Sequence, residues 1–222
     1  MSLRKFTAAL AVAAVLSANA SAATIVQYAT AGGVNPLPAF FADAAVSADG
    51  LTAGSGLNVQ NFSTFNTTGW DVASTSFADA VAADDVWTWG FDVTGSTPLD
   101  LTTMDFRLDR SGTGPDDVEI EVSVNGGAGI PVFFHDYNDS GAGVNFVGVD
   151  LSGVPTLVSG DSVVFTLGAY NSESAAGSLD LETITFPGGT DSLTIFGEFV
   201  PEPTSFVMLS LGAMGLGFVR RR

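Results

Sequence analysis

The sequence predicts an all-β fold: a jelly-roll-like antiparallel β-sandwich, flanked by an N-terminal signal peptide and a short C-terminal transmembrane helix. Short runs of β-branched and aromatic residues recur between glycine-rich turns, and no long segment repeats its apolar residues at helical spacing. Each end of the chain carries an apolar stretch beside basic residues. The predicted segments are therefore 1–22, a signal peptide, 23–199, a β-sandwich domain, and 200–222, a C-terminal tail.

The strongest strand signals lie in the middle of the chain. In Val86–Val93 the alternate residues from Trp87 to Val93 place three aromatic rings and a valine on one face. The Asn125-Gly126 pair that follows an alternating run is typical of a tight hairpin turn. Further strands are predicted at Leu99–Leu108, Val118–Val124, Ile130–His135, Val144–Leu151, Ser162–Tyr170, Ser178–Phe186 and Ser192–Phe199. Two stacked sheets would bury their apolar faces.

The pattern is weaker in the first third of the body. Thr24–Tyr28, Leu57–Phe65 and Trp70–Phe77 are interpreted as strands because they combine β-branched and aromatic residues. Gly32–Asp43 is interpreted as a loop, since it contains two prolines. For Ala78–Asp85 a helical turn and a loop are both open.

The body between the two ends is strongly acidic. Of the 24 acidic residues only Glu202 lies in the terminal segments, whereas Arg107 and Arg110 are the only basic residues of the body. Such a charge balance repels nucleic acid and anionic lipid, so a nucleic-acid partner is excluded. The chain has no cysteine, which excludes disulfides and thiolate metal sites.

The N-terminal segment has the three parts of a secretory signal peptide. Arg4 and Lys5 form a basic region, Phe6–Leu16 is apolar, and small residues follow at the expected cleavage position. Cleavage is predicted after Ala22, with cleavage after Ala20 as the alternative. The chain is therefore expected to be exported by the Sec machinery.

The C-terminal segment also has three parts. Pro201, Glu202 and Pro203 cannot join a helix, because proline fixes φ and lacks an amide donor. The uncharged stretch Phe206–Val219 would form a helix about 21 Å long, short against a hydrocarbon core of ~30 Å. The chain then ends in a cluster that the positive-inside rule places on the cytoplasmic side, formed by Arg220, Arg221 and Arg222.

The order Pro-Glu-Pro, apolar helix and arginine cluster resembles a PEP-CTERM signal. The resemblance implies an exported protein of a Gram-negative bacterium that an exosortase-type enzyme processes at the Pro-Glu-Pro region. It also implies an inner-membrane intermediate and a final location in the envelope, at the cell surface or in the extracellular matrix. An ordinary tail anchor is the alternative for this segment.

Two inner stretches add to the resemblance. Phe106–Pro115 contains R-S-G-T-G-P and is similar to a turn found in many PEP-CTERM proteins. Val147–Phe186 resembles the closing strands of jelly-roll domains of the carbohydrate-binding-module type. In those strands an Asp-Asn pair often stands where this chain has Glu182 and Thr183, so a ligand role does not carry over to that position.

Few residues suggest catalysis or metal binding. His135 is the only histidine, and it is interpreted as a surface or loop residue because no G-x-S-x-G motif accompanies it. Oxygen ligands suit calcium, and a candidate Ca²⁺ site is formed by Asp136, Asn138 and Asp139. Asp84-Asp85 and Asp116-Asp117 are further candidates. The alternative for all of them is a solvated acidic loop.

These observations lead to three hypotheses. The first is a non-enzymatic protein of the cell surface or of an exopolysaccharide-rich biofilm matrix, with no catalytic residues. The second is a carbohydrate-binding or calcium-dependent adhesion module, which would line one exposed sheet face or loop rim with aromatic side chains. The third is an envelope glycoside hydrolase, which would need two carboxylates at a suitable separation in a cleft. Trp70 or Tyr170 would stack on sugars if exposed, but tryptophans of a small sandwich are more often core.

Overall fold

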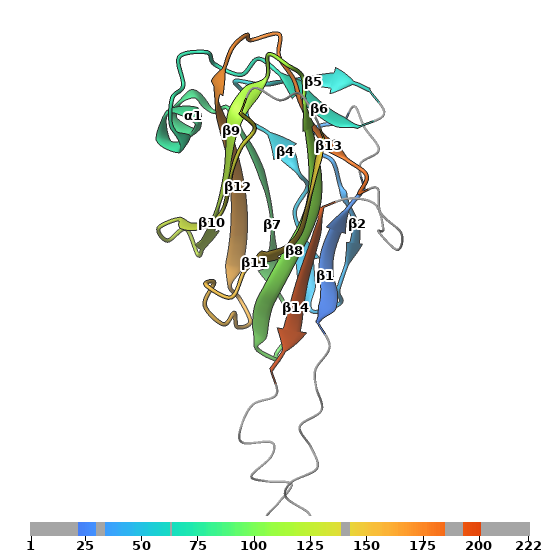
Figure 1. Ribbon diagram of the computed structural model, residues 1–222. Coiled ribbons are helices and arrows are strands. Elements are labelled where there is room, and N and C mark those ends of the chain that lie inside the picture. Colours follow the sequence, from blue (N-terminus) through green and yellow to red (C-terminus); the bar gives the residue numbers. More distant parts are fainter. Residues whose placement is uncertain (1–21, 30–33, 63, 139–142, 185–192, 201–222) are drawn as a thin grey trace, which may run out of the picture.

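The computed structural model is an antiparallel β-sandwich, and it describes residues 22–29, 34–62, 64–138, 143–184 and 193–200. Within these ranges the strands form two sheets that pack face to face, with one short helix beside them (Figure 1). This confirms the predicted all-β sandwich. In chain order the elements are β1 (Ala23–Tyr28), β2 (Ala39–Ala42), β3 (Val46–Ala48), β4 (Thr52–Ala53), β5 (Asn58–Asn61), β6 (Phe65–Thr68), α1 (Phe77–Ala83), β7 (Val86–Val93), β8 (Leu99–Arg110), β9 (Pro115–Val124), β10 (Ile130–Asp136), β11 (Val144–Asp150), β12 (Ser162–Ser172), β13 (Leu179–Glu182) and β14 (Thr194–Phe199).

One sheet has six strands among the described residues, in the order β10-β9-β12-β7-β3, with β4 also paired to β7. Its edge hairpin, β9 to β10, turns at the predicted position. Asn125 and Gly126 have φ of 54° and 68°, and the amide of Gly127 donates to the carbonyl of Val124 at 2.9 Å. Two consecutive positive φ values define the turn that Asn-Gly favours, so the local sequence sets the register of this hairpin.

The other sheet has eight strands among the described residues and is built around β8. Arg107 of β8 pairs with Asn145 of β11 and with Glu182 of β13. Met104 likewise pairs with β11 and with β14. A strand has two edges, so β13 and β14 lie end to end along the edge opposite β11. From there the sheet divides into two arms, β13-β6-β5 and β14-β1-β2.

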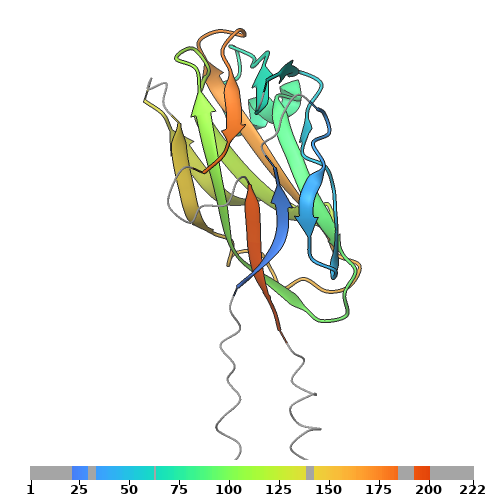
Figure 2. The same cartoon turned by 90° about the vertical axis from the view of Figure 1, so that its right-hand side faces the viewer.

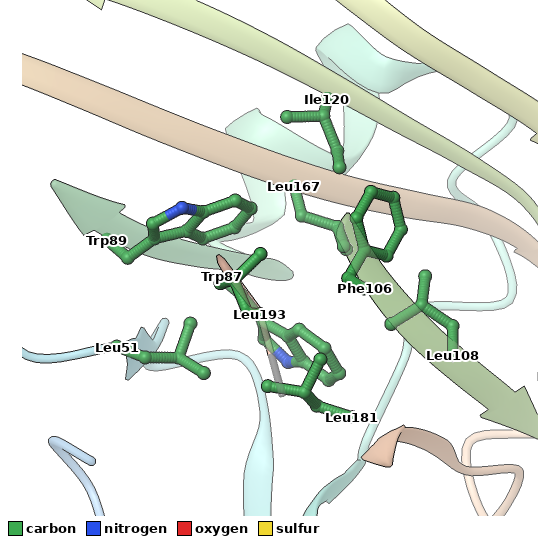
Figure 3. Close-up of a pocket in the computed structure, with 9 residues that line it drawn as sticks. All are labelled: Leu51, Trp87, Trp89, Phe106, Leu108, Ile120, Leu167, Leu181 and Leu193. Carbon is green, nitrogen blue, oxygen red and sulfur yellow. The ribbon is translucent and has the colours of Figure 1, made fainter. Parts of the chain in front are cut away.

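The core fills the space between the sheets where these arms separate. Figure 3 shows apolar side chains of both sheets converging on one point, around a cavity of about 10 Å³. That volume is close to the minimum for a single water molecule, so the cavity is a packing gap and not a ligand pocket. Its lining consists of Leu51, Trp87, Trp89, Phe106, Leu108, Ile120, Leu167, Leu181 and Leu193.

The three tryptophans belong to this core. Trp70, Trp87 and Trp89 are at most 3% exposed, which confirms that they do not form a sugar platform. The indole of Trp87 donates to the hydroxyl of Thr67 at 3.1 Å, and its ring meets Phe65 edge to face at a centroid distance of 5.2 Å. A buried indole N–H needs an acceptor, and Thr67 of β6 supplies it across the sandwich.

The two ends of the body lie side by side. β1 pairs with β14 in antiparallel register, so the chain enters and leaves at the same end of the sandwich (Figures 1 and 2). The amide of Val200 still donates to the carbonyl of Pro98 at 2.8 Å. The backbone of the body is therefore hydrogen-bonded as far as Val200.

Two predictions in the first third of the body were wrong. Within the predicted loop Gly32–Asp43, Ala39–Ala42 form β2, because they add to the free edge of β1. The predicted strand Leu57–Phe65 is divided between β5 and β6, which pair as a hairpin. In both cases the pairing partner decides the structure, and local composition does not reveal that partner.

The predicted strand Trp70–Phe77 was also wrong. The carboxylate of Asp71 accepts from the amide of Ala73 at 2.9 Å, which bends the chain into a turn. Ser76 then caps α1, since its hydroxyl accepts from the amide of Asp79 at 3.2 Å. For Ala78–Asp85 a helical turn and a loop were the alternatives, and the helical one is confirmed. The helix α1 lies beside β12 (Figure 1).

Candidate functional site

The outer face of the six-stranded sheet brings aromatic and carboxylate side chains together. Phe134 of β10 is paired directly with Glu119 of β9, so both lie on one face. In the next row Asp117 of β9 stands between Asp136 of β10 and Tyr170 of β12. We call this surface the aromatic–acidic face and define it by Asp117, Glu119, Glu121, Phe134, Asp136 and Tyr170.

Phe134 is the solvent-exposed aromatic ring of this face. Its side chain is 58% exposed, because the alternation of β10 turns it away from the core. Phe133 on the other side of the strand points inward, where its ring lies 4.7 Å from that of Phe146 and 5.1 Å from that of Phe106. One residue of β10 thus packs the sandwich edge while its neighbour is free to meet a ligand.

Tyr170 and Glu119 are coupled. The Tyr170 hydroxyl and the Glu119 carboxylate are close enough for each group to shift the pKa of the other. Partial burial, followed by the negative charge of Glu121, raises the pKa of Glu119, and the Tyr170 hydroxyl offsets part of that effect. Partial burial, followed by the charges of Glu119 and Asp117, raises the pKa of Tyr170 to about 12. The phenol stays protonated at neutral pH and can donate a hydrogen bond.

The helix α1 bounds one side of the face. Gly168 of β12 is paired with Glu119, and a Cβ added there would lie 2.7 Å from the ring of Phe77. The helix can pack onto the sheet here because this position has no side chain. Away from the helix, a row of half-buried polar side chains crosses β9, β12, β7 and β4, formed by Glu121, Thr166, Thr88 and Thr52.

His135 is not the surface or loop residue that the sequence suggested. It belongs to β10 and is half-buried, with its ring 4.6 Å from Tyr137 and 4.9 Å from Phe146. Desolvation lowers the pKa of His135, and the charge of Asp136 offsets part of this. An aromatic cluster at the edge between the sheets therefore holds this histidine in place.

The candidate calcium loop follows β10. The Asp136 carboxylate accepts from the amide of Asn138 at 2.7 Å, and the Asn138 amide group donates to the carbonyl of Asp136 at 3.3 Å. These two residues form a small turn, with Asn138 at φ of 47°. Asp139 lies outside the described residues. Within the described residues no three acidic or histidine side chains are arranged to hold a metal ion, and the calcium site stays a prediction.

Among the other acidic pairs, Asp84, Asp85 and Asp116 serve the fold, whereas Asp117 belongs to the aromatic–acidic face. Asp84 and Asp85 each accept a 2.6 Å hydrogen bond from a backbone amide of a neighbouring loop. Asp116 forms an ion pair with Arg110, a residue only 2% exposed. Arg110 also donates to the carbonyls of Ser111 and Gly112, which explains the arginine at the start of the R-S-G-T-G-P turn.

The residues predicted for export lie mostly outside the described residues. Ala20 and the tail residues 201–222 are not among them. Ala22 is exposed and directly precedes β1. In the described part of the chain no helix combines the length and the apolar character that a membrane crossing requires. Cleavage after Ala22 or Ala20 stays a prediction.

Comparison with protein-family models matches residues 199–222 to the PEP-CTERM protein-sorting motif. The chain therefore carries a PEP-CTERM sorting motif. The match begins at Phe199, the last residue of β14, so the motif follows the sandwich without a linker. A PEP-CTERM motif implies an exported protein that an exosortase-type enzyme processes, as the resemblance of the tail predicted.

Comparison with solved structures finds distant likenesses. A mutant of the family 29 carbohydrate-binding module CBM29-2 shares 11% identity over 79% of this chain and 93% of its own, with a TM-score of 0.41. The GH26-CBM35 beta-(1,4)-mannanase of Podospora anserina shares 17% identity over 81% of this chain and 29% of its own, with a TM-score of 0.33. A family two carbohydrate esterase from Cellvibrio japonicus shares 14% identity over 82% of this chain and 36% of its own, with a TM-score of 0.28. Comparison with curated proteins finds no match.

Proposed function

We propose that this is an exported, non-enzymatic protein of the cell surface or extracellular matrix, in an exopolysaccharide-rich biofilm. The observation that carries the proposal is the PEP-CTERM motif at residues 199–222. The body supports it, because β1 and β14 bring both ends of the sandwich to one side. If the tail holds the body at the membrane, the opposite end of the sandwich would point away from the membrane, and both sheet faces would stay accessible.

The sorting role is tested by changing the motif. With Pro201, Glu202 and Pro203 replaced by alanine, we expect an unprocessed form that stays with the membrane. The measurement is an immunoblot of fractionated cells that carry an exosortase-type enzyme, beside cells that lack it. Val158→Ala, a change at an exposed residue of the body outside the matched motif, is the control and should mature normally. Normal maturation of the triple variant would contradict the proposal.

A second candidate, a carbohydrate-binding or calcium-dependent adhesion module, is favoured by one observation. Phe134 is 58% exposed on a sheet face that also carries Tyr170 and several carboxylates. This is the arrangement of exposed aromatic and polar groups that such a module needs. The two candidates are compatible, because a matrix protein that binds a polysaccharide would be retained by it.

A further inference from the structure

We propose that the aromatic–acidic face binds an extended, neutral polysaccharide. This rests on the proposed function and deepens it, since it names the site and the chemical class of the ligand. An exposed phenylalanine alone would need no explanation. The proposal comes from the charge, the hydrogen-bonding groups and the dimensions of the surface around Phe134.

The charge of the face selects against anionic ligands. Asp117, Glu119 and Glu121 lie in successive outward positions of β9, and Asp136 lies beside them on β10. The basic residues of the body are elsewhere: Arg110 is buried, and Arg107 belongs to the eight-stranded sheet. A polymer of uronic acids, a phosphorylated glycan or an anionic lipid would be repelled here.

The hydrogen-bonding character selects for a ligand rich in donors. Ionised carboxylates only accept hydrogen bonds. The hydroxyl groups of a sugar supply donors, and the apolar face of a sugar ring can cover an exposed aromatic ring such as Phe134. The hydroxyls of the threonine row, Thr166, Thr88 and Thr52, donate and accept, so they can continue the same contacts across the sheet.

The dimensions select for a chain of sugars over a single one. Phe134 and Tyr170 lie on strands that are separated by β9, and they are offset by one row of outward residues. With strands about 4.8 Å apart and a rise of about 3.4 Å per residue, their Cα atoms lie roughly 12 Å apart, a distance of about two sugar rings. Tyr170 is paired with Asp117 in the ladder between β12 and β9, so its backbone position is set before a ligand arrives.

Affinity gel electrophoresis of the full-length protein in detergent tests the proposal. The probes are hydroxyethyl cellulose and galactomannan, which are neutral, and alginate, which is anionic. We expect a neutral polysaccharide to retard the protein and alginate to leave it unchanged. Phe134→Ala should weaken the interaction about tenfold. Phe40→Ala is the matched control, because Phe40 is 75% exposed but belongs to β2 of the other sheet.

Several outcomes would overturn the proposal. They are no retardation by either neutral polymer, equal loss in Phe134→Ala and Phe40→Ala, or retardation by alginate. Chitosan, which is cationic, is run as a fourth probe; retardation by chitosan alone, abolished by salt, would overturn the proposal and assign the face to cationic ligands. None of these results depends on tail processing, so failure here is distinguishable from failure of the sorting experiment. Circular dichroism of each variant shows whether it is folded.

Discussion

The outer faces of the two sheets are both acidic, but their carboxylates are in different surroundings. On the six-stranded sheet no arginine or lysine accompanies the aromatic–acidic face among the described residues, and Phe134 is open. On the eight-stranded sheet Arg107 lies among the acids. Its Nε is 2.8 Å from Glu182, and Nη1 donates to Asn145 at 3.2 Å. On the second face, which we call the closed face, Arg107 compensates part of the negative charge, and the first, open face has no such residue among the described residues.

Asp180 shows that carboxylates of the closed face are also partly removed from solvent. It is paired with Asn66 on β6 and with Asp109 on β8, in one row across the sheet. Burial, followed by the charges of Glu182 and Asp109, raises the pKa of Asp180 to about 7. Among the described residues no donor reaches the buried Oδ1 atom of Asp180 or of Asn66, and a protonated Asp180 would provide one. Acidity alone therefore does not identify a binding face. The two faces differ in whether a positive charge compensates the carboxylates and in how far the carboxylates are buried.

The largest expected effect contrasts two neighbours on β10. Phe133→Ala should lower the free energy of unfolding by about 2–3 kcal/mol, because it empties the aromatic cluster between the sheets. Phe134→Ala should change it by less than about 0.5 kcal/mol, since the ring faces solvent. Urea denaturation followed by fluorescence measures both. Equal losses would mean that the face is not open.

An intermediate effect is expected on the closed face. Arg107→Ala removes the partner of Glu182 and leaves it beside Asp109 and Asp180, which should cost about 1–2 kcal/mol of unfolding free energy. The matched control on the other face is Glu121→Gln, where no arginine is lost and little change is expected. Thermal unfolding of both variants at low and high salt would show this. Comparable losses would remove the contrast between the faces.

The smallest effect concerns Asp180 and depends on pH. Its folded pKa, about 7, lies above the unfolded value near 3.8, so the folded state binds the extra proton and stability declines as pH rises through this window. Asp180→Asn removes the charge and should stabilise the protein at pH 8 by on the order of 1 kcal/mol, allowing for solvent screening.

At pH 4 the wild-type carboxyl is largely protonated, so the Asp180→Asn variant should then match the wild type. The measurement is the melting temperature from pH 4 to pH 8, with Asp117→Asn as the control on the open face. A stabilisation that does not vary with pH would contradict the buried, protonated Asp180.

Much of the fold could be predicted where the information is local. Strands β7 to β9 are predicted from period-two alternation, β10 to β12 from their β-branched and aromatic composition, and the β9–β10 turn from Asn125 and Gly126. The capping pattern from Ser76 to Asp79 was a signal that the strand interpretation of Trp70–Phe77 missed. The short strands β2, β3 and β4 gave no comparable signal, because they exist by pairing with β1 and β7.

By itself the sequence determined the β class of the body, the strongly acidic surface and the sorting motif, because alternation, charge and the order of parts in the tail are properties of contiguous residues. Only the tertiary structure decided which acids stand together and in what surroundings. The pairing of Phe134 with Glu119, the position of Tyr170, and the row of Asn66, Asp180 and Asp109 all join segments far apart in the chain. Desolvation and charge matching depend on those neighbours, so they cannot be deduced from residues considered one stretch at a time.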